Sequence, residues 1–154
     1  MEDLLRWLHV IGACVLLGTG AGIAFFMVNS HRSKDAALIA HVASIVVIAD
    51  FVFTATAALL QPITGWLLAL QIGWSLSDLW LSISIILYVL IGVFWLPVIA
   101  IQIKLRNLAR VASAANQDLP LAYFRLYRIW FFCGFPAFIS VLAILWLMLA
   151  KPAL

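Results

Sequence analysis

The chain has 154 residues, of which 67% are apolar and only 10% are charged. Soluble domains are about half apolar and about a quarter charged, so this composition excludes a water-soluble globular protein. The net charge of +3 comes from basic residues that cluster between apolar stretches, and the sequence carries no nucleic-acid-binding motif. We therefore expect an all-α integral membrane protein that is surrounded by a lipid bilayer and binds no nucleic acid.

Four apolar stretches are long enough to cross a bilayer, because a helix needs about 20 residues to span the hydrocarbon core. They cover residues 4–29, 36–60, 79–104 and 128–150. Short connections favour antiparallel neighbours. The sequence thus predicts a single transmembrane domain over residues 1–154, folded as a four-transmembrane-helix up-down-up-down bundle.

The second span is expected to end at Gln61, Pro62 and Gly65, because proline and glycine interrupt a helical pattern. The apolar stretch that follows, residues 66–74, is too short to cross the membrane. It begins and ends with tryptophan, which favours the level of the lipid headgroups. These residues predict a short interfacial segment between the second and third spans.

The basic residues indicate the orientation, since Lys and Arg are retained in short cytoplasmic loops. No Lys or Arg occurs between Asp35 and Ile103. The first and third connections, by contrast, hold seven basic residues, namely Arg32, Lys34, Lys104, Arg106, Arg110, Arg125 and Arg128. We expect a multi-pass protein of the bacterial inner (cytoplasmic) membrane with both termini outside.

The ionisable side chains of His9 and Asp50 fall inside the predicted spans, where such residues are costly and tend to mark functional sites. At about 1.5 Å of rise per residue, His9 lies about 9 Å below the outer surface, and Asp50 reaches about the same depth from the inside. The two side chains are therefore expected to meet. Such a pair can hold a metal ion or a proton. It can equally be an interhelical hydrogen bond that joins the first two spans.

Small residues follow His9 on the same face of the first span, beginning with Gly12 and Ala13 and continuing past Leu16 to Gly20. A flat macrocycle fits against such a surface, and so does a closely packed helix. The other histidine of this region, His31, is expected to be a solvated residue of the first connection.

Five segments carry a family resemblance: Leu8–Gly12, Asp50–Thr54, Gln61–Gly65, Trp95–Pro97 with Gln102, and Trp130–Pro136. Together they are similar to a bacterial family of predicted integral membrane proteins of unknown function, over nearly the whole chain. More remotely, Leu8 and His9 followed by small residues resemble CopD-type copper-resistance proteins and HemJ-type haem-binding membrane proteins. That likeness implies that the first-helix histidine, here His9, binds haem or a metal.

The leading functional hypothesis is a membrane protein that binds a b-type haem or related porphyrin on the outer side, for electron transfer or redox chemistry. His9 is then the ligand of the haem iron, which accepts a single histidine, while Gly12 and Asp50 complete the cofactor-binding site. One alternative is a cation/proton or copper-handling transporter component that uses His9 and Asp50. Another is a ligand-free membrane assembly or structural partner. A homo-oligomer or a membrane redox partner is compatible with each, and no catalytic residue is assigned.

Overall fold

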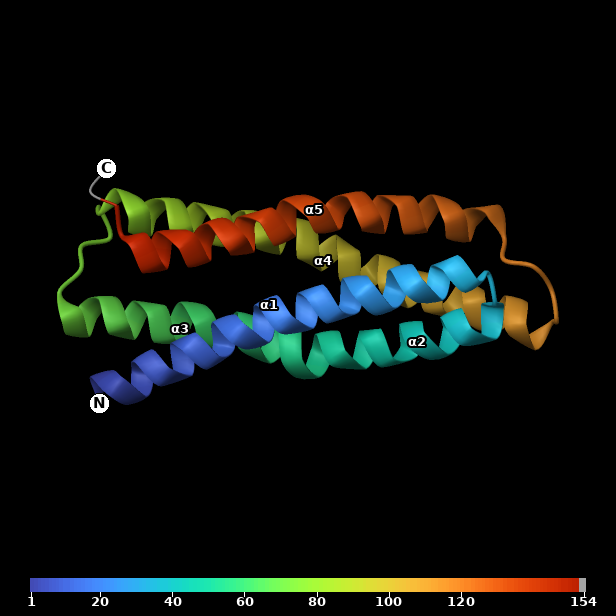
Figure 1. The fold of residues 1–154 in the computed structure, drawn as a ribbon, viewed down its shortest axis with the longest axis horizontal. Coiled ribbons are helices and arrows are strands. Elements are labelled where there is room, and N and C mark those ends of the chain that lie inside the picture. Colours follow the sequence, from blue (N-terminus) through green and yellow to red (C-terminus); the bar gives the residue numbers. More distant parts are fainter. Residues whose placement is uncertain (153–154) are drawn as a thin grey trace.

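The computed structural model describes residues 1–152, which form long helices and no strand. The helices are α1 (Glu2–Ser33), α2 (Ala36–Ala49), the π-helix η1 (Asp50–Thr54), α3 (Ala55–Ile72), α4 (Leu79–Ala114) and α5 (Leu121–Ala150). Because α2, η1 and α3 follow one another without a break, they form one continuous rod (Figure 1). The bundle therefore consists of four rods.

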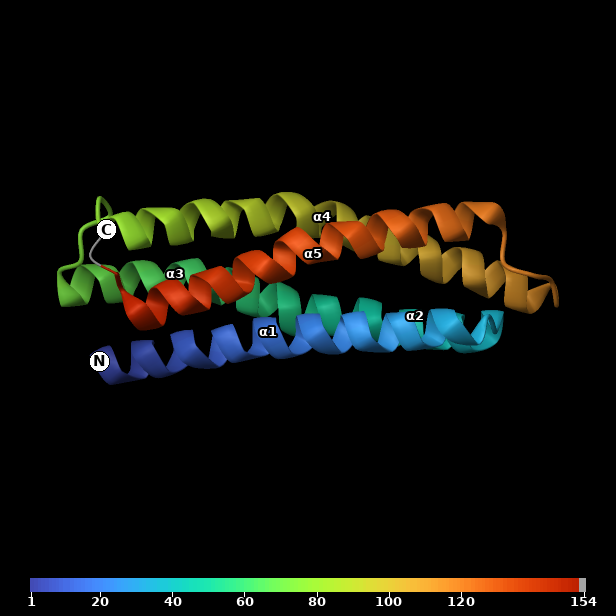
Figure 2. The ribbon, with the colours of Figure 1, turned by 45° about the horizontal axis from the view of Figure 1, so that its top comes forward.

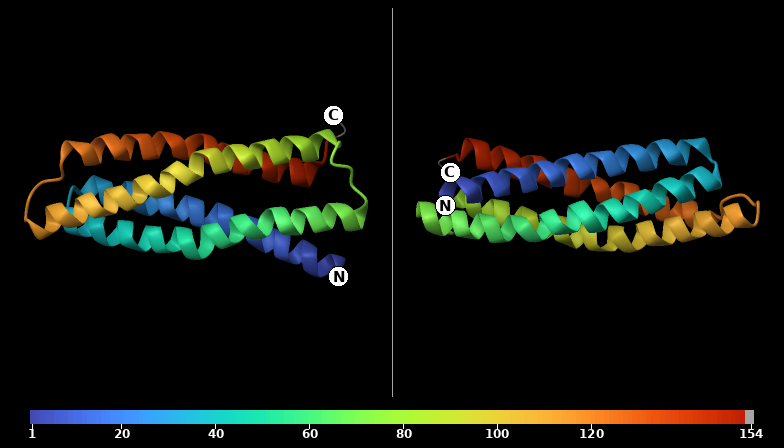
Figure 3. Two further views of the ribbon diagram at one scale, coloured as in Figure 1. Left: turned by 180° about the vertical axis from the view of Figure 1, so that it is seen from behind. Right: turned by 90° about the horizontal axis from the view of Figure 1, so that it is seen from below.

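The four rods lie lengthwise beside one another in all of the views (Figures 1, 2 and 3). The N-terminus, the α3–α4 connection and the end of α5 lie at one end of the bundle, which we call the terminal end. The α1–α2 and α4–α5 connections lie at the other. We call this the basic end, because the basic residues of the first and third connections gather there. Charge is thus segregated along the bundle, as the sequence pattern predicts.

Local chemistry explains where the helices end. Lys34, after the last residue of α1, has a left-handed backbone with φ 58°, and the Asp35 side chain then accepts the N–H groups of Ala37 and Leu38. A carboxylate at this position caps the free N–H groups of a helix start. At the terminal end, α3 stops at Gly73, whose φ of 82° suits a residue without a Cβ atom.

The rod continues through Pro62 to Ile72, so the expected break at residues 61–65 and the separate interfacial segment over residues 66–74 are wrong. Proline at position 62 removes the N–H that would bond to the carbonyl of Ala58, four residues earlier. The hydroxyl of Tyr88 on α4 donates to that carbonyl instead. A side chain from a neighbouring helix thus replaces the lost backbone hydrogen bond. Membrane helices tolerate proline where the freed carbonyl finds such a partner.

Apolar packing is concentrated in two clusters. At the basic end, Ile39 and Ala43 of α2 pack against Leu105 of α4 and Tyr123 of α5. The second cluster, at the terminal end, joins α3, α4 and α5 through Ala69, Trp80, Leu81 and Leu147. The stretch between the two clusters holds the buried polar residues described below.

The outer surface of the bundle is apolar. Large side chains such as Phe25, Leu59, Ile86 and Phe132 are more than half exposed. Four helical stretches, with α2, η1 and α3 counted as one, are long and apolar enough to cross a membrane. Apolar surface of this extent is stable only against lipid, so the chain is a multi-pass integral membrane protein.

Candidate functional site

The centre of the site is η1, where the helix widens. The N–H of Ala55 donates to the carbonyl of Asp50, five residues earlier, instead of the usual four. Short π-helical turns within α-helices occur frequently at functional sites, since they re-aim side chains. Here the widening coincides with a change in packing: α2 packs against both α4 and α1, whereas α3 packs chiefly against α1.

Asp50 is buried between the α2–α3 rod and α4, with 3% of its surface exposed. The indole Nε1 of Trp95 on α4 donates to its Oδ1 over 3.4 Å. The side chains of Thr54, one turn further along the rod, and Gln102 on α4 are its other polar neighbours. A carboxyl group is thus enclosed by neutral polar groups in the middle of a membrane-spanning bundle.

Three oxygen atoms at this point have no hydrogen-bond partner within residues 1–152: Asp50 Oδ2, Thr54 Oγ1 and Gln102 Oε1. An unsatisfied buried polar atom costs about 1–3 kcal/mol, and more if it is charged. No basic residue between positions 36 and 103 can balance the carboxylate. A proton on the carboxyl group would satisfy these oxygen atoms through hydrogen bonds. A cation bound by the three oxygen atoms would satisfy them as well.

A second polar cluster lies towards the terminal end, where α1 meets α3. The Nδ1 of His9 is 2.8 Å from Oγ1 of Thr64, and the side-chain amide of Gln61 donates to the His9 carbonyl over 2.7 Å. The imidazole packs against Gly65, where any Cβ would press on the His9 ring. These contacts fix both the position and the ring orientation of His9.

The expected contact between His9 and Asp50 is wrong. His9 bonds to Thr64, which follows Asp50 by 14 residues on the same rod and is therefore about 20 Å further along the bundle. The reason is the helix that continues through Pro62: the rod reaches Ile72, so Asp50 lies near its middle and not near its outer end. The structure gives each residue its own polar partners.

The small-residue face of α1 is used for helix packing. Gln61 and Leu60 of α3 fill the space beside Gly12, and a Cβ there would overlap the Gln61 amide. A macrocycle seated on His9 and Gly12 therefore does not fit this face. Within residues 1–152 no group of three or more His, Cys, Asp or Glu side chains is placed to hold a metal ion. Haem b at His9 stays a prediction, and any macrocycle has to approach from another side.

Four buried polar residues of the rod share one face, and we call them the polar stripe: Asp50, Thr54, Gln61 and Thr64. Their spacing of four, seven and three residues keeps them on one side of a helix. The stripe leads from His9 to the centre of the bundle. Sequence reasoning missed Thr54, Gln61, Thr64, Trp95 and Gln102 as site residues, although this spacing was a detectable signal in an otherwise apolar span.

His31 also differs from expectation. It lies within α1, not in a solvated connection, and its ring stacks on Tyr127 with 3.6 Å between the centroids. Its Nδ1 is 3.4 Å from the hydroxyl of Tyr123. His31 therefore joins α1 to α5 at the basic end.

Comparison with known proteins identifies the family. The family described as predicted integral membrane protein (DUF2269) matches residues 3–152 of the chain. The chain belongs to DUF2269. No curated protein and no solved structure matches this DUF2269 chain. The remoter likeness to CopD-type and HemJ-type proteins finds no counterpart in these comparisons and stays an expectation.

Proposed function

We propose that this DUF2269 protein is a proton-handling transporter component in which Asp50 binds a proton at the centre of the membrane. The observation that carries the proposal is a buried carboxyl group with no ion-pair partner, whose unpartnered Oδ2 lies beside two further unpartnered oxygen atoms, Thr54 Oγ1 and Gln102 Oε1. Ionisable residues inside membrane bundles are typical of proton relays and ion pathways. A purely structural hydrogen-bond pair would leave no acceptors unsatisfied.

A proton satisfies these groups better than a metal cation does. A protonated Asp50 carboxyl is neutral, and its O–H donates to one of the neighbouring acceptors, Gln102 Oε1 or Thr54 Oγ1. Hard metal cations generally take six or more oxygen ligands, which is more than the three available here. The indole N–H of Trp95 supports either form of the carboxyl.

The polar stripe supports access to Asp50 from the terminal end, which the positive-inside rule makes the outer side. His9 and Thr64 form the entrance, and Gln61 is the next residue inwards. About 10 Å of helix separates Gln61 from Thr54, and the Tyr88 hydroxyl lies on this stretch at the carbonyl of Ala58. Alternating hydroxyl, amide and imidazole groups are the chemistry of a proton path. Since four helices make a small transporter, we expect the protein to act as a homo-oligomer.

The test is labelling by a hydrophobic carbodiimide, which adds to protonated carboxyl groups in apolar surroundings and forms a stable N-acylurea. We expect mass spectrometry of the protein in nanodiscs to find the adduct on Asp50, with labelling that falls as the pH rises. Asp50→Asn should abolish the adduct. The exposed Asp3 is the internal control and should stay unlabelled.

Two outcomes contradict the proposal. If Asp50 is never labelled between pH 5 and about pH 9, it does not hold an exchangeable proton. If Na⁺ suppresses labelling at constant pH while protons do not compete, the site binds a metal cation. Transport is measured as the uptake of protons by proteoliposomes after the external pH is lowered. Asp50→Asn should reduce this uptake relative to the wild-type protein.

Binding of haem b through His9 is the second candidate. The observation in its favour is the bond between Nδ1 and Thr64, because a ligating histidine is generally held through one ring nitrogen while the other binds the metal. A visible absorption spectrum of the purified protein tests it directly. A Soret band that disappears in His9→Ala supports haem, and a colourless protein purified from haem-supplemented cells contradicts it.

A further inference from the structure

Two arginines near the start of α5 have no acidic partner. Arg125 and Arg128 are both exposed, and the one ion pair found within residues 1–152 joins Arg6 to Glu2 at the opposite end of the bundle. The first turn of α5 carries no acidic residue, and its N-cap Pro120 provides no side-chain hydrogen bond. Two unpaired guanidinium groups thus lie one turn apart on the surface of α5. They can bind an anion from outside the chain.

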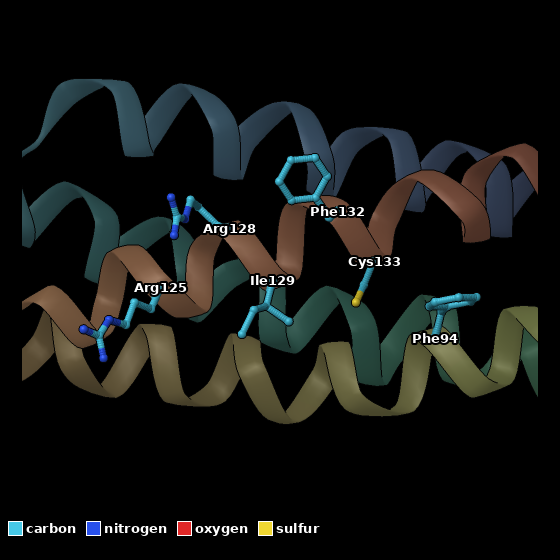
Figure 4. A pocket seen from close by; sticks show the side chains of 6 residues that line it. All are labelled: Phe94, Arg125, Arg128, Ile129, Phe132 and Cys133. Carbon is cyan, nitrogen blue, oxygen red and sulfur yellow. The ribbon is translucent and has the colours of Figure 1, made fainter.

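The two arginines open into an apolar groove of about 700 Å³ that runs along α5 beside α4. Its other lining residues are Ile129, Phe132 and Cys133 of α5 and Phe94 of α4. Figure 4 shows the guanidinium groups of Arg125 and Arg128 at one end of the groove and Cys133 with Phe94 at the other. Ile129 is 51% exposed and Phe132 68% exposed, so the groove is open towards the surrounding lipid.

We propose that this groove binds an anionic phospholipid of the leaflet at the basic end. Its phosphate lies between Arg125 and Arg128, whose planar forks suit bidentate phosphate binding. One acyl chain follows Ile129, Phe132 and Cys133 towards Phe94 and the bilayer centre. The order of the lining residues, cationic first and apolar after, matches the order of a lipid from headgroup to chain. Basic pockets between transmembrane helices on the cytoplasmic side recognise anionic headgroups in this way.

Charge and position favour a lipid over a second copy of this chain. A second copy would have to bring an acidic side chain to the depth of Arg125. Glu2, Asp3 and Asp78 lie at the terminal end, Asp50 is buried and Asp35 caps α2, which leaves Asp118 as the remaining acidic residue of the sequence. Lipid, in contrast, is present at this surface at high concentration. The proposal is independent of the proton site, because the groove lines α5 and Asp50 lies between the α2–α3 rod and α4.

The experiment is native mass spectrometry of the delipidated protein with phosphatidylglycerol or phosphatidylcholine added at matched concentrations. We expect at least tenfold tighter binding of phosphatidylglycerol. Arg125→Gln combined with Arg128→Gln should remove this preference, whereas the double change to lysine should keep most of it. Arg106→Gln is the matched control, since Arg106 lies at the same end but outside the groove.

A phosphatidylglycerol with a diazirine in the middle of one acyl chain locates the chain. Its crosslinks should map to Phe132, Cys133 or Phe94, and they should disappear in the double glutamine variant. Equal binding of the two lipids, or an unchanged preference in that variant, overturns the proposal. The proposal is also overturned if the lipid-free protein is a dimer that the same two substitutions dissociate, because a second copy of the chain then occupies the groove. Far-ultraviolet circular dichroism confirms that each variant is folded.

Discussion

The hydroxyl of Tyr88 donates to the carbonyl of Ala58, the group that Pro62 leaves without a backbone partner. One side chain of α4 thus keeps the α2–α3 rod continuous. The position of every residue beyond Pro62, including Thr64 at the entrance of the polar stripe, depends on this continuity.

Tyr88→Phe should destabilise the protein by about 1 kcal/mol, because a buried carbonyl loses its donor. In a Pro62→Ala background the backbone N–H at position 62 takes over, so the same substitution should cost much less. A double-mutant cycle from thermal unfolding in detergent measures the difference. Equal costs in both backgrounds would show that Tyr88 does not compensate for the proline.

Gly12→Ala should destabilise the contact between α1 and α3, although alanine is the better helix former. The new methyl group displaces the Gln61 amide, which then loses its bond to the His9 carbonyl. We expect a loss of about 1 kcal/mol, and in a Gln61→Ala background, where this bond is already absent, Gly12→Ala should cost much less. Gly18→Ala is the control, since nothing lies within 4 Å of a Cβ there. That variant should be neutral or slightly more stable.

Thr54→Val should separate function from stability. The Thr54 hydroxyl makes no hydrogen bond in the described residues, so an isosteric valine should leave thermal stability unchanged or raise it by about 1 kcal/mol. Proton uptake by proteoliposomes should nevertheless fall. The control is Thr56→Val, the same substitution at an exposed residue whose hydroxyl bonds to the Val52 carbonyl. If both variants take up protons at the wild-type rate, Thr54 is not part of the proton site.

If haem is bound, His9→Ala should abolish its absorption spectrum while His31→Ala leaves it intact. His31 stacks on Tyr127 at the basic end, far from His9, and its loss should instead lower stability by weakening the contact between α1 and α5. Spectra and thermal unfolding curves of the two variants distinguish these effects. Retention of the Soret band in His9→Ala would exclude this residue as the iron ligand.

Both termini should lie on the outer side of the membrane. The seven basic residues of the first and third connections gather at the end opposite the termini, and such residues are retained in the cytoplasm. An alkaline phosphatase fusion at the C-terminus should therefore be active, and a fusion within the α4–α5 connection inactive. The reverse pattern would invert the proposed side of proton access as well.

Composition and charge placement predicted the membrane class, the four apolar helices and the gathering of basic residues at one end, because these depend on hydropathy alone. The partners of His9 and Asp50 were not predictable in the same way. The depth of Asp50 was counted from Ala36 for a span that ended at residue 60, and the continuation to Ile72 depends on Tyr88, which is remote in sequence. The role of Gly12 likewise depends on which residue of α3 faces it, and that follows from packing.

The π-helix sets which face of α3 meets α1. Compared with a regular α-helix, η1 accommodates one extra residue without turning the helix that follows, so deleting any one of Phe51, Val52 and Phe53 would restore the regular winding and leave Gln61 and Thr64 on their present face. If the same residues wound as a regular α-helix with no deletion, α3 would turn by about 100° relative to α2. Gln61 and Thr64 would then turn away from α1, so the width of one turn decides whether the polar stripe reaches His9.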